Sequence, residues 1–192
     1  MTKIKVLGID CSLNNLGLCI CEVDPHLNIT VLETKLIKND DVYPAKMLKS
    51  FQDFNKSKKF AKALREIIGE NKIQICVGEI PCGSQSSRAC TSAGVVTGLL
   101  GSIASYCPVC GVTPIQAKKA SVGCNTATKE DVIAWVQQTH PEVIFRTRKL
   151  HGEDVVMKDC EHEADSIAIV TAGLLTPEFQ QLMMYYLSSG SE

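Results

Sequence analysis

The sequence predicts one mixed α/β domain with the element order β-β-β-α-β-α-β-α-α, and three observations indicate it. Three short apolar segments follow one another closely at the start, a fourth comes after a long amphipathic stretch, and helical spacing dominates the last third. Apolar residues make up 45% and charged residues 21% of the 192 residues, which is typical of a globular chain. We expect a single domain over residues 1–192, with a core at about 4–175 and a terminal helix and tail at 176–192.

The first three strands are expected to form an antiparallel meander. KIKVLGIDCS, residues 3–12, and LGLCICEV, residues 16–23, are rich in apolar and β-branched residues. ITVLETKLI, residues 29–37, continues the pattern, and the polar residues 14–15 and 25–28 supply the turns.

A helix and a buried strand are expected next. Residues 46–69 show helical spacing, with a face that includes Phe51, Phe54 and Leu64. IQICVGEI, residues 73–80, is almost continuously apolar, which predicts a strand buried on both faces. A right-handed helical crossover would make the first and fourth strands parallel neighbours.

The second half of the chain is predicted to be mainly helical. SSRACTSAGVVTGLLGSIASYC, residues 86–107, indicates a helix whose small residues pack closely on the sheet, and residues 111–116 a short fifth strand. TATKEDVIAWVQQTH, residues 126–140, begins with Thr128 as a good N-cap. HEADSIAIVTAGLL, residues 162–175, is the last core helix.

Charge and cysteine usage favour an intracellular protein. The formal net charge of −1 gives no global attraction to nucleic acid, although basic residues gather at 55–65 and 146–149. There is no apolar run of about 18 residues and no signal-like start, so we expect a cytoplasmic protein. The ten cysteines lie mostly in apolar segments, as reduced thiols do. Cys107 and Cys110 have the spacing of a zinc-ligand pair, but a second such pair is missing from the sequence.

Three acidic residues stand out by their position. Asp10 and Glu79 end the first and fourth strands, and Asp165 lies within an otherwise apolar helix. Because sites in α/β sheets gather at the carboxyl ends of strands, Asp10 and Glu79 should lie close together. Neighbouring carboxylates repel unless a cation lies between them, and a few hard oxygen ligands suit Mg²⁺ or Mn²⁺. His162, one helical turn before Asp165, is a fourth candidate, with Glu161 as its alternative. Taken singly, each residue is also open to a purely structural explanation.

Four segments of the chain together resemble the RuvC group of Holliday junction resolvases, in the RNase H-like superfamily. GIDCSLNNLG, residues 8–17, resembles the first-strand motif, and VGEI, residues 77–80, resembles the fourth strand. PIQAKKASVGCNTATKEDV, residues 114–132, is similar to the segment that ends in a Lys-acid-x-Val helix start. HEADSIAIV, residues 162–170, resembles the closing helix, whose metal-site positions are aspartate or histidine and, three residues later, aspartate.

This resemblance implies a ribonuclease H fold, in which a five-stranded mixed sheet is flanked by helices. It also implies a homodimer that resolves four-way DNA junctions by paired nicks, in DNA recombination and repair, without a nucleotide cofactor or a membrane. Two Mg²⁺ ions per site, which Mn²⁺ could replace, would activate water and stabilise the leaving oxygen. The metal roles fall on Asp10, Glu79, His162 and Asp165, and the phosphate contacts on Lys118 and Lys129, of which Lys118 would also act in catalysis.

One position departs from the pattern of the family. The better-known bacterial enzymes carry an aromatic residue three positions after the strand-four glutamate, where it helps to open the junction, and here that position is Cys82. Stacking on an aromatic side chain contributes ~1–3 kcal/mol per base, so its absence should weaken junction opening. Viral members of the group are looser in substrate choice, and flaps or forks become alternative substrates.

Other functions stay open on the sequence alone. A nuclease of the same fold could act on flaps, forks or RNA–DNA hybrids, and a branched-DNA binding protein could have lost catalysis. The presence of all four metal-site positions argues against the second option. An actin-like ATPase would also begin with an aspartate and glycines, but it would need a second phosphate loop and would leave the segment from Lys118 to Lys129 unexplained.

Overall fold

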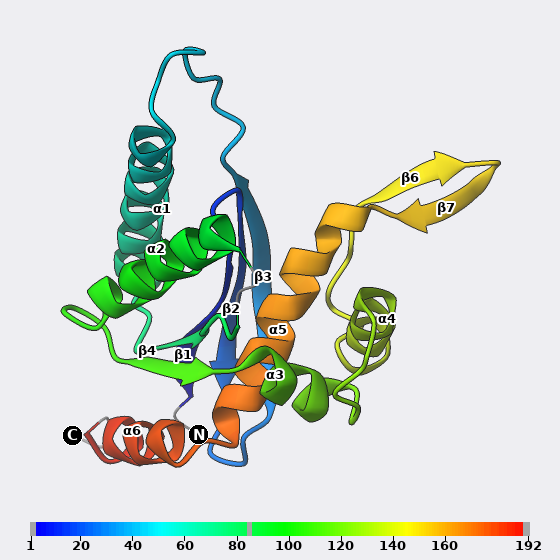
Figure 1. The fold of residues 1–192 in the computed structure, drawn as a ribbon. Helices are drawn as coiled ribbons and strands as arrows, with labels where there is room; N and C mark the ends of the chain where they lie inside the picture. The colour runs from blue at the N-terminus through cyan, green and yellow to red at the C-terminus, as the bar shows by residue number, and fades with distance from the viewer. Residues whose placement is uncertain (1–2, 84–85, 190–192) are drawn as a thin grey trace.

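A five-stranded mixed sheet in the order β3-β2-β1-β4-β5 forms the centre of the protein (Figure 1). The structure, a computed structural model, describes residues 3–83 and 86–189, so residues 190–192 of the expected tail lie outside the described residues. β1 (Ile4–Cys11), β2 (Asn15–Val23) and β3 (Ile29–Lys38) form the antiparallel meander, and β4 (Ile75–Glu79) and β5 (Val109–Val112) add parallel strands. The predicted mixed α/β class and the parallel pairing of β1 with β4 are confirmed.

Helices cover both faces of this sheet (Figure 1). α1 (Lys49–Asn71) and α2 (Ser87–Ile103) lie on one face, and α5 (Glu161–Leu174) lies on the other. α3 (Pro114–Ser121) and α4 (Lys129–Thr139) pack against α5. The short 3₁₀ turn η1 (Lys158–Cys160) leads into α5, and α6 (Pro177–Ser189) follows it.

The core has two apolar layers, one on each face of the sheet. Residues of β1 alternate between them, with Val6 facing the α5 side and Leu7 the side of α1 and α2. β4 does the same with Val77 and Cys76, as its continuous apolar run predicted. On the far side, Arg88 of α2 joins α1 through a bidentate ion pair with the buried Asp53. β1 and β4 are therefore packed on both of their faces.

Two expectations about local structure were wrong. The predicted face of α1 is only partly buried: Leu64 packs in the core as expected, together with Phe60, whereas Phe51 and Phe54 are 59% and 63% exposed. The fifth strand ends at Val112, before the expected PIQ segment. That segment instead begins α3, because Thr113 and Gln116 form a capping box and Pro114 stands at the helix start.

A hairpin that the sequence did not suggest projects from the body between α4 and α5 (Figure 1). β6 (Thr147–Leu150) pairs in antiparallel fashion with β7 (Glu153–Val156). The two residues of its turn, His151 and Gly152, have positive φ angles of 51° and 90°. Such a pair is typical of a tight two-residue hairpin turn.

The cysteines of this chain are free thiols. Cys107 and Cys110, the pair with zinc-ligand spacing, are both buried, and no group of three or more His, Cys, Asp or Glu side chains among residues 3–83 and 86–189 is arranged to hold a metal ion. In the same two ranges, no helix combines the length and the apolar character needed to cross a membrane.

Candidate active site

The candidate site lies where β1 and β4 end, side by side. Ile9 of β1 is in register with Gly78 of β4, so the next residues, Asp10 and Glu79, are neighbours at the carboxyl end of the sheet. α5 crosses this end of the sheet and carries His162 and Asp165. Asp10 and Glu79, which are far apart in the sequence, therefore lie close together at the carboxyl end of the sheet, as predicted, and α5 joins them there.

Glycines in the first two strands allow α5 to approach this edge closely. A Cβ atom at Gly17 would lie 2.1 Å from the carbonyl oxygen of His162, and one at Gly8 would lie 2.2 Å from that of Ser166. Real Cβ atoms do not come so close, so the backbone of α5 rests directly on β1 and β2. The glycine that closes the GIDCSLNNLG segment thus has a packing reason, which is to place His162 beside the end of β1.

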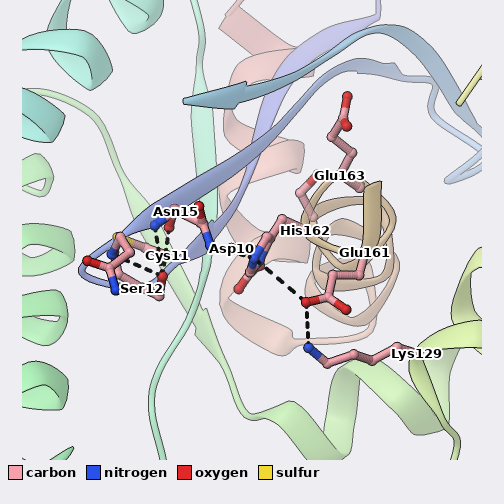
Figure 2. Close-up of polar contacts among 10 residues, drawn as sticks. Asp10, Cys11, Ser12, Asn15, Lys129, Glu161, His162 and Glu163 are labelled. Atoms are coloured by element: carbon pink, nitrogen blue, oxygen red, sulfur yellow. Dashed lines mark hydrogen bonds and ion pairs between the residues drawn. The ribbon is translucent and has the colours of Figure 1, made fainter. Parts of the chain in front are cut away.

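His162 is held from both sides of its ring (Figure 2). Its Nδ1 atom lies 2.6 Å from Oδ2 of Asp10, and its Nε2 atom lies 3.0 Å from Nδ2 of Asn15. Because an amide nitrogen only donates, Nε2 accepts in this arrangement and Nδ1 donates its proton to Asp10. The hydrogen bond to Asp10 raises the pKa of His162 above its ordinary value, despite partial burial of the ring.

The turn between β1 and β2 fixes Asn15. The Ser12 hydroxyl accepts hydrogen bonds from the backbone N–H groups of Asn14 and Asn15, at 3.3 and 2.9 Å, and donates one to the Asn15 carbonyl. From the sequence, Asn15 was expected only to form a turn, and its contact with His162 was not predicted. A polar residue at the first position of a strand otherwise buried is the one signal that could have indicated it.

Glu79 and Asp165 are two carboxyl groups that face one cavity of about 160 Å³. Burial, followed by the charges of Asp10 and Asp165, raises the pKa of Glu79 to about 7. Burial and the charge of Asp10 likewise raise the pKa of Asp165 to about 7. The charges of Asp10 and Asp165 thus act on Glu79, and the charge of Asp10 acts on Asp165, as expected for carboxyl groups at one end of the sheet.

The two predicted phosphate-binding lysines line the same cavity. Lys118 lies on α3, and its charge lowers the pKa of Glu79 against the effect of burial. Lys129 is the first residue of α4, whose N-cap, Thr128, forms a capping box with Asp131. The Nζ atom of Lys129 lies 2.6 Å from Oε1 of Glu161 (Figure 2).

Glu161 lies between this lysine and the histidine. Its Oε1 atom, which binds Lys129, is 3.8 Å from Nε2 of His162, beyond hydrogen-bonding distance (Figure 2). The sequence named Glu161 only as a possible substitute for His162 as a ligand. In the structure its carboxylate binds Lys129 instead.

The donor set fits a divalent cation in its chemistry. Asp10, Glu79, His162 and Asp165, here called the candidate cluster, supply carboxylate oxygens and one imidazole, which are ligands of Mg²⁺ and Mn²⁺ sites. Glu79 and Asp165 have raised pKa values, and a nearby positive charge would lower them again. Within the described residues, however, these side chains are not arranged as a ligand cage, and Oδ2 of Asp10 is hydrogen-bonded to His162. The ligand assignment stays a prediction.

Comparisons with known proteins identify the fold that carries this site. No family model and no curated protein matches the sequence. Solved structures do match: Thermus thermophilus RuvC in complex with a Holliday junction substrate has a TM-score of 0.65 and 22% identity, over 88% of this chain and 92% of that chain. The yeast mitochondrial Holliday junction resolvase Ydc2 has a TM-score of 0.59 and 12% identity, over 97% of this chain and 82% of that chain.

The chain has the RuvC-type, RNase H-like fold. The resemblance drawn from the four sequence segments is thereby confirmed at the level of the fold. Within this RuvC fold, the segments lie at the end of β1, at the end of β4, across α3 and α4, and at the start of α5. Each of them contributes a side chain to the candidate cluster or to the cavity beside it.

Proposed function

We propose that this protein is a structure-selective endodeoxyribonuclease that hydrolyses phosphodiester bonds in branched DNA, with the four-way junction as its substrate. One observation carries the proposal: Glu79 and Asp165 of the candidate cluster line the same cavity as Lys118 and Lys129, beside Asp10 and His162. Carboxylates that can hold cations, placed beside lysines that can hold phosphate, are what hydrolysis of a phosphodiester requires. The RuvC-type fold supports the same conclusion, since its solved examples include resolvases named for Holliday junctions.

A divalent cation is part of this proposal. Asp10, Glu79, Asp165 and His162 would hold it, and we expect Mg²⁺, replaceable by Mn²⁺, with two ions per site. Bound cations of this kind lower the pKa of a bound water and stabilise the leaving oxygen. Only Oδ2 of Asp10 accepts the hydrogen bond from His162, so Asp10 could hold the cation with or without this bond, and His162 would either help to hold the ion or orient water at the site.

The lysines would position the scissile strand. Lys118 faces the cavity from α3, and Lys129 stands at the N-terminus of α4, where backbone N–H groups also favour phosphate. The Lys129 ammonium group has three donors, of which one binds Glu161, so it could contact a phosphate oxygen as well. Such contacts fix the DNA backbone without reading the base sequence.

Paired nicks need two active sites, so we propose that two copies of the chain act together. The junction itself must be opened for cleavage, and Cys82, at the position of the usual aromatic wedge, is exposed but offers no ring for stacking. This observation favours a second candidate function, a nuclease of the same chemistry with broader specificity for flaps and forks.

A substrate panel tests the proposal. A four-way junction, a flap, a fork, a linear duplex and an RNA–DNA hybrid are incubated with the protein in Mg²⁺, Mn²⁺ or Ca²⁺, and nicks are mapped on every strand. We expect symmetric nicks in the junction with Mg²⁺ and Mn²⁺ and binding without cleavage in Ca²⁺. Faster cleavage of flaps or forks would favour the second candidate. Tight junction binding with no cleavage in any metal would identify a binding protein and contradict the nuclease.

A further inference from the structure

The hairpin formed by β6 and β7, here called the ribbon (residues 147–156), is the part of the molecule that the proposed function leaves unexplained. It extends away from the sheet and helices (Figure 1), and all residues from 147 to 155 are exposed. An isolated two-stranded hairpin is marginally stable in water. Because the ribbon contributes little to the core, packing does not explain which residues it carries.

The base of the ribbon is fixed to the body by ion pairs. Arg146, just before β6, binds Glu163 of α5 at 2.8 Å, and Glu163 also accepts a hydrogen bond from Thr34 of β3 at 3.1 Å. Asp159 of η1, just beyond β7, binds Lys38 of β3 at 2.6 Å. The Met157 N–H donates to the Arg146 carbonyl at 2.8 Å and closes the base. The ribbon is thus a fixed projection, anchored at one end.

The two faces of the ribbon differ in how their basic residues are used. Arg148 is directly opposite Val155, and both line a groove of about 360 Å³ between the ribbon and α4. The next residue, Lys149, points to the opposite face because side chains alternate along a strand. There it forms an ion pair with Asp154 at 2.9 Å. The groove face therefore presents an arginine, and the other face presents a neutralised lysine.

The groove adjoins the candidate active site at Lys129. Lys129 lines both the groove and the cavity that contains Glu79 and Asp165. Lys158, in η1 at the base of the ribbon, also lines the groove. Neither Lys158 nor Arg148 forms an ion pair with any residue that the structure describes. Of the two acidic residues in the groove, Glu130 and Glu161, the second is bound to Lys129.

We propose that this groove is a second phosphate-binding surface, in which Arg148 and Lys158 bind the backbone of a duplex arm that leaves the active site. The proposal rests on the proposed function. An arginine guanidinium binds phosphate oxygens through two parallel hydrogen bonds, and the groove leads such a backbone from Lys129 outward along the ribbon. Strands of four residues reach roughly 13 Å beyond the base, which corresponds to about four base pairs of duplex.

Arg148→Ala and Lys149→Ala form a matched pair for the test, because they remove one positive charge each from adjacent positions on opposite faces. Binding of a fluorescent four-way junction is measured in Ca²⁺ over a series of salt concentrations. We expect Arg148→Ala to weaken binding by about fivefold to tenfold and to reduce the slope of log K against log salt by about 0.9, the value for one lost phosphate contact. Lys149→Ala should change the affinity by less than about twofold. Arg148→Lys keeps the charge but loses the two parallel hydrogen bonds, so it should restore the salt slope and only part of the affinity.

Arm length gives an independent measurement. Shortening one pair of arms until it no longer reaches the ribbon should weaken wild-type binding at least to the level of Arg148→Ala, and should weaken Arg148→Ala less than the wild type, because that variant keeps only the Lys158 contact. Equal effects of Arg148→Ala and Lys149→Ala, or an Arg148→Ala variant that binds like the wild type, would overturn the proposal. Wild-type nicking of the same junction in Mg²⁺ is recorded in parallel. If the wild type cuts while the variants bind alike, only the ribbon proposal fails, whereas a wild type that neither binds nor cuts contradicts the proposed function as well.

Discussion

The Nδ1 atom of His162, on α5, lies 2.6 Å from the Oδ2 atom of Asp10, at the end of β1. This contact joins the first strand to the last core helix, and it depends on Gly17, above which the His162 backbone lies. It fixes the orientation of the Asp10 carboxylate beside the other members of the candidate cluster. In the proposed mechanism Asp10 would also hold a divalent cation, so this side chain links the fold to metal binding.

Asn15→Ala should lower the rate of junction nicking by about fivefold, because the His162 ring loses the hydrogen bond at Nε2, a contribution of about 1 kcal/mol. The control is Asn14→Ala, since the neighbouring Asn14 side chain contacts Lys56 on the other side of the turn and does not reach the ring. Single-turnover rates and melting temperatures are compared for the three proteins. A rate loss that Asn14→Ala shares in full, or that follows a lower melting temperature, would show that Asn15 only maintains the turn.

Gly17→Ala should destabilise the protein and displace α5, because its Cβ atom would meet the His162 carbonyl at 2.1 Å. The matched change is Gly69→Ala, in α1, where nothing lies within 4 Å of the added atom. That variant should be more stable than the wild type by about 0.5–1 kcal/mol, as alanine is a better helix former than glycine. Urea unfolding measures both free energies. A Gly17→Ala protein as stable as the wild type would contradict the close contact between β2 and α5.

Protein stability without metal should fall as the pH rises toward neutrality. Glu79 and Asp165 have pKa values raised to about 7 in the folded protein, from ordinary values of 4.5 and 3.8. A carboxyl group with a raised pKa stabilises the fold fully below its unfolded pKa, and this contribution is lost as the pH rises through about 7. Asp165→Asn, which cannot ionise, should therefore show a weaker fall.

Melting temperatures between pH 5 and pH 8.5, with EDTA and with Mg²⁺, measure this effect. Mg²⁺ should stabilise the wild type most at the high end of the range, where the carboxylates are charged, by a few degrees. Asp165→Asn should gain less from Mg²⁺. Identical pH profiles for the two proteins in EDTA would show that the Asp165 carboxyl group does not titrate as the structure indicates.

Much of the fold follows from local patterns in the sequence. β4 is almost continuously apolar, which indicated a strand buried on both faces, and a right-handed helical crossover indicated the parallel pairing of β1 and β4. On α1, Phe51 and Phe54 were assigned to the wrong face. Phe51 precedes the buried Phe60 by nine residues, two and a half helical turns, so its side chain points to the opposite side of the helix.

The ribbon escaped prediction for a different reason. Its residues are exposed on both faces, so it lacks the apolar alternation that identifies a strand, and Arg148 and Lys149 suggested only a basic surface. Its turn depends on positive φ angles at His151 and Gly152, and only the glycine is a recognised signal for them.

The candidate site was more predictable than its internal contacts. Asp10 and Glu79 were indicated by their positions at strand ends, and Asp165 by its apolar neighbours. The contacts of His162 with Asn15 and of Lys129 with Glu161 join residues far apart in the sequence, and no local spacing predicts such pairs. The family resemblance supplied the roles of individual residues, whereas the structure supplied their partners.

The most direct test of the central claim, that the carboxylates of the candidate cluster act as one cation-dependent site, is the nicking rate of a four-way junction in Mg²⁺ for Asp10→Asn, Asp165→Asn and the double variant. Each single change should reduce the rate by at least about a hundredfold, and the double variant should be no slower than the slower single variant, because the groups act as a unit. Junction binding in Ca²⁺ should stay within about threefold of the wild type. A single variant that still nicks at a rate near that of the wild type, or losses in rate that merely follow losses in binding, would contradict the account.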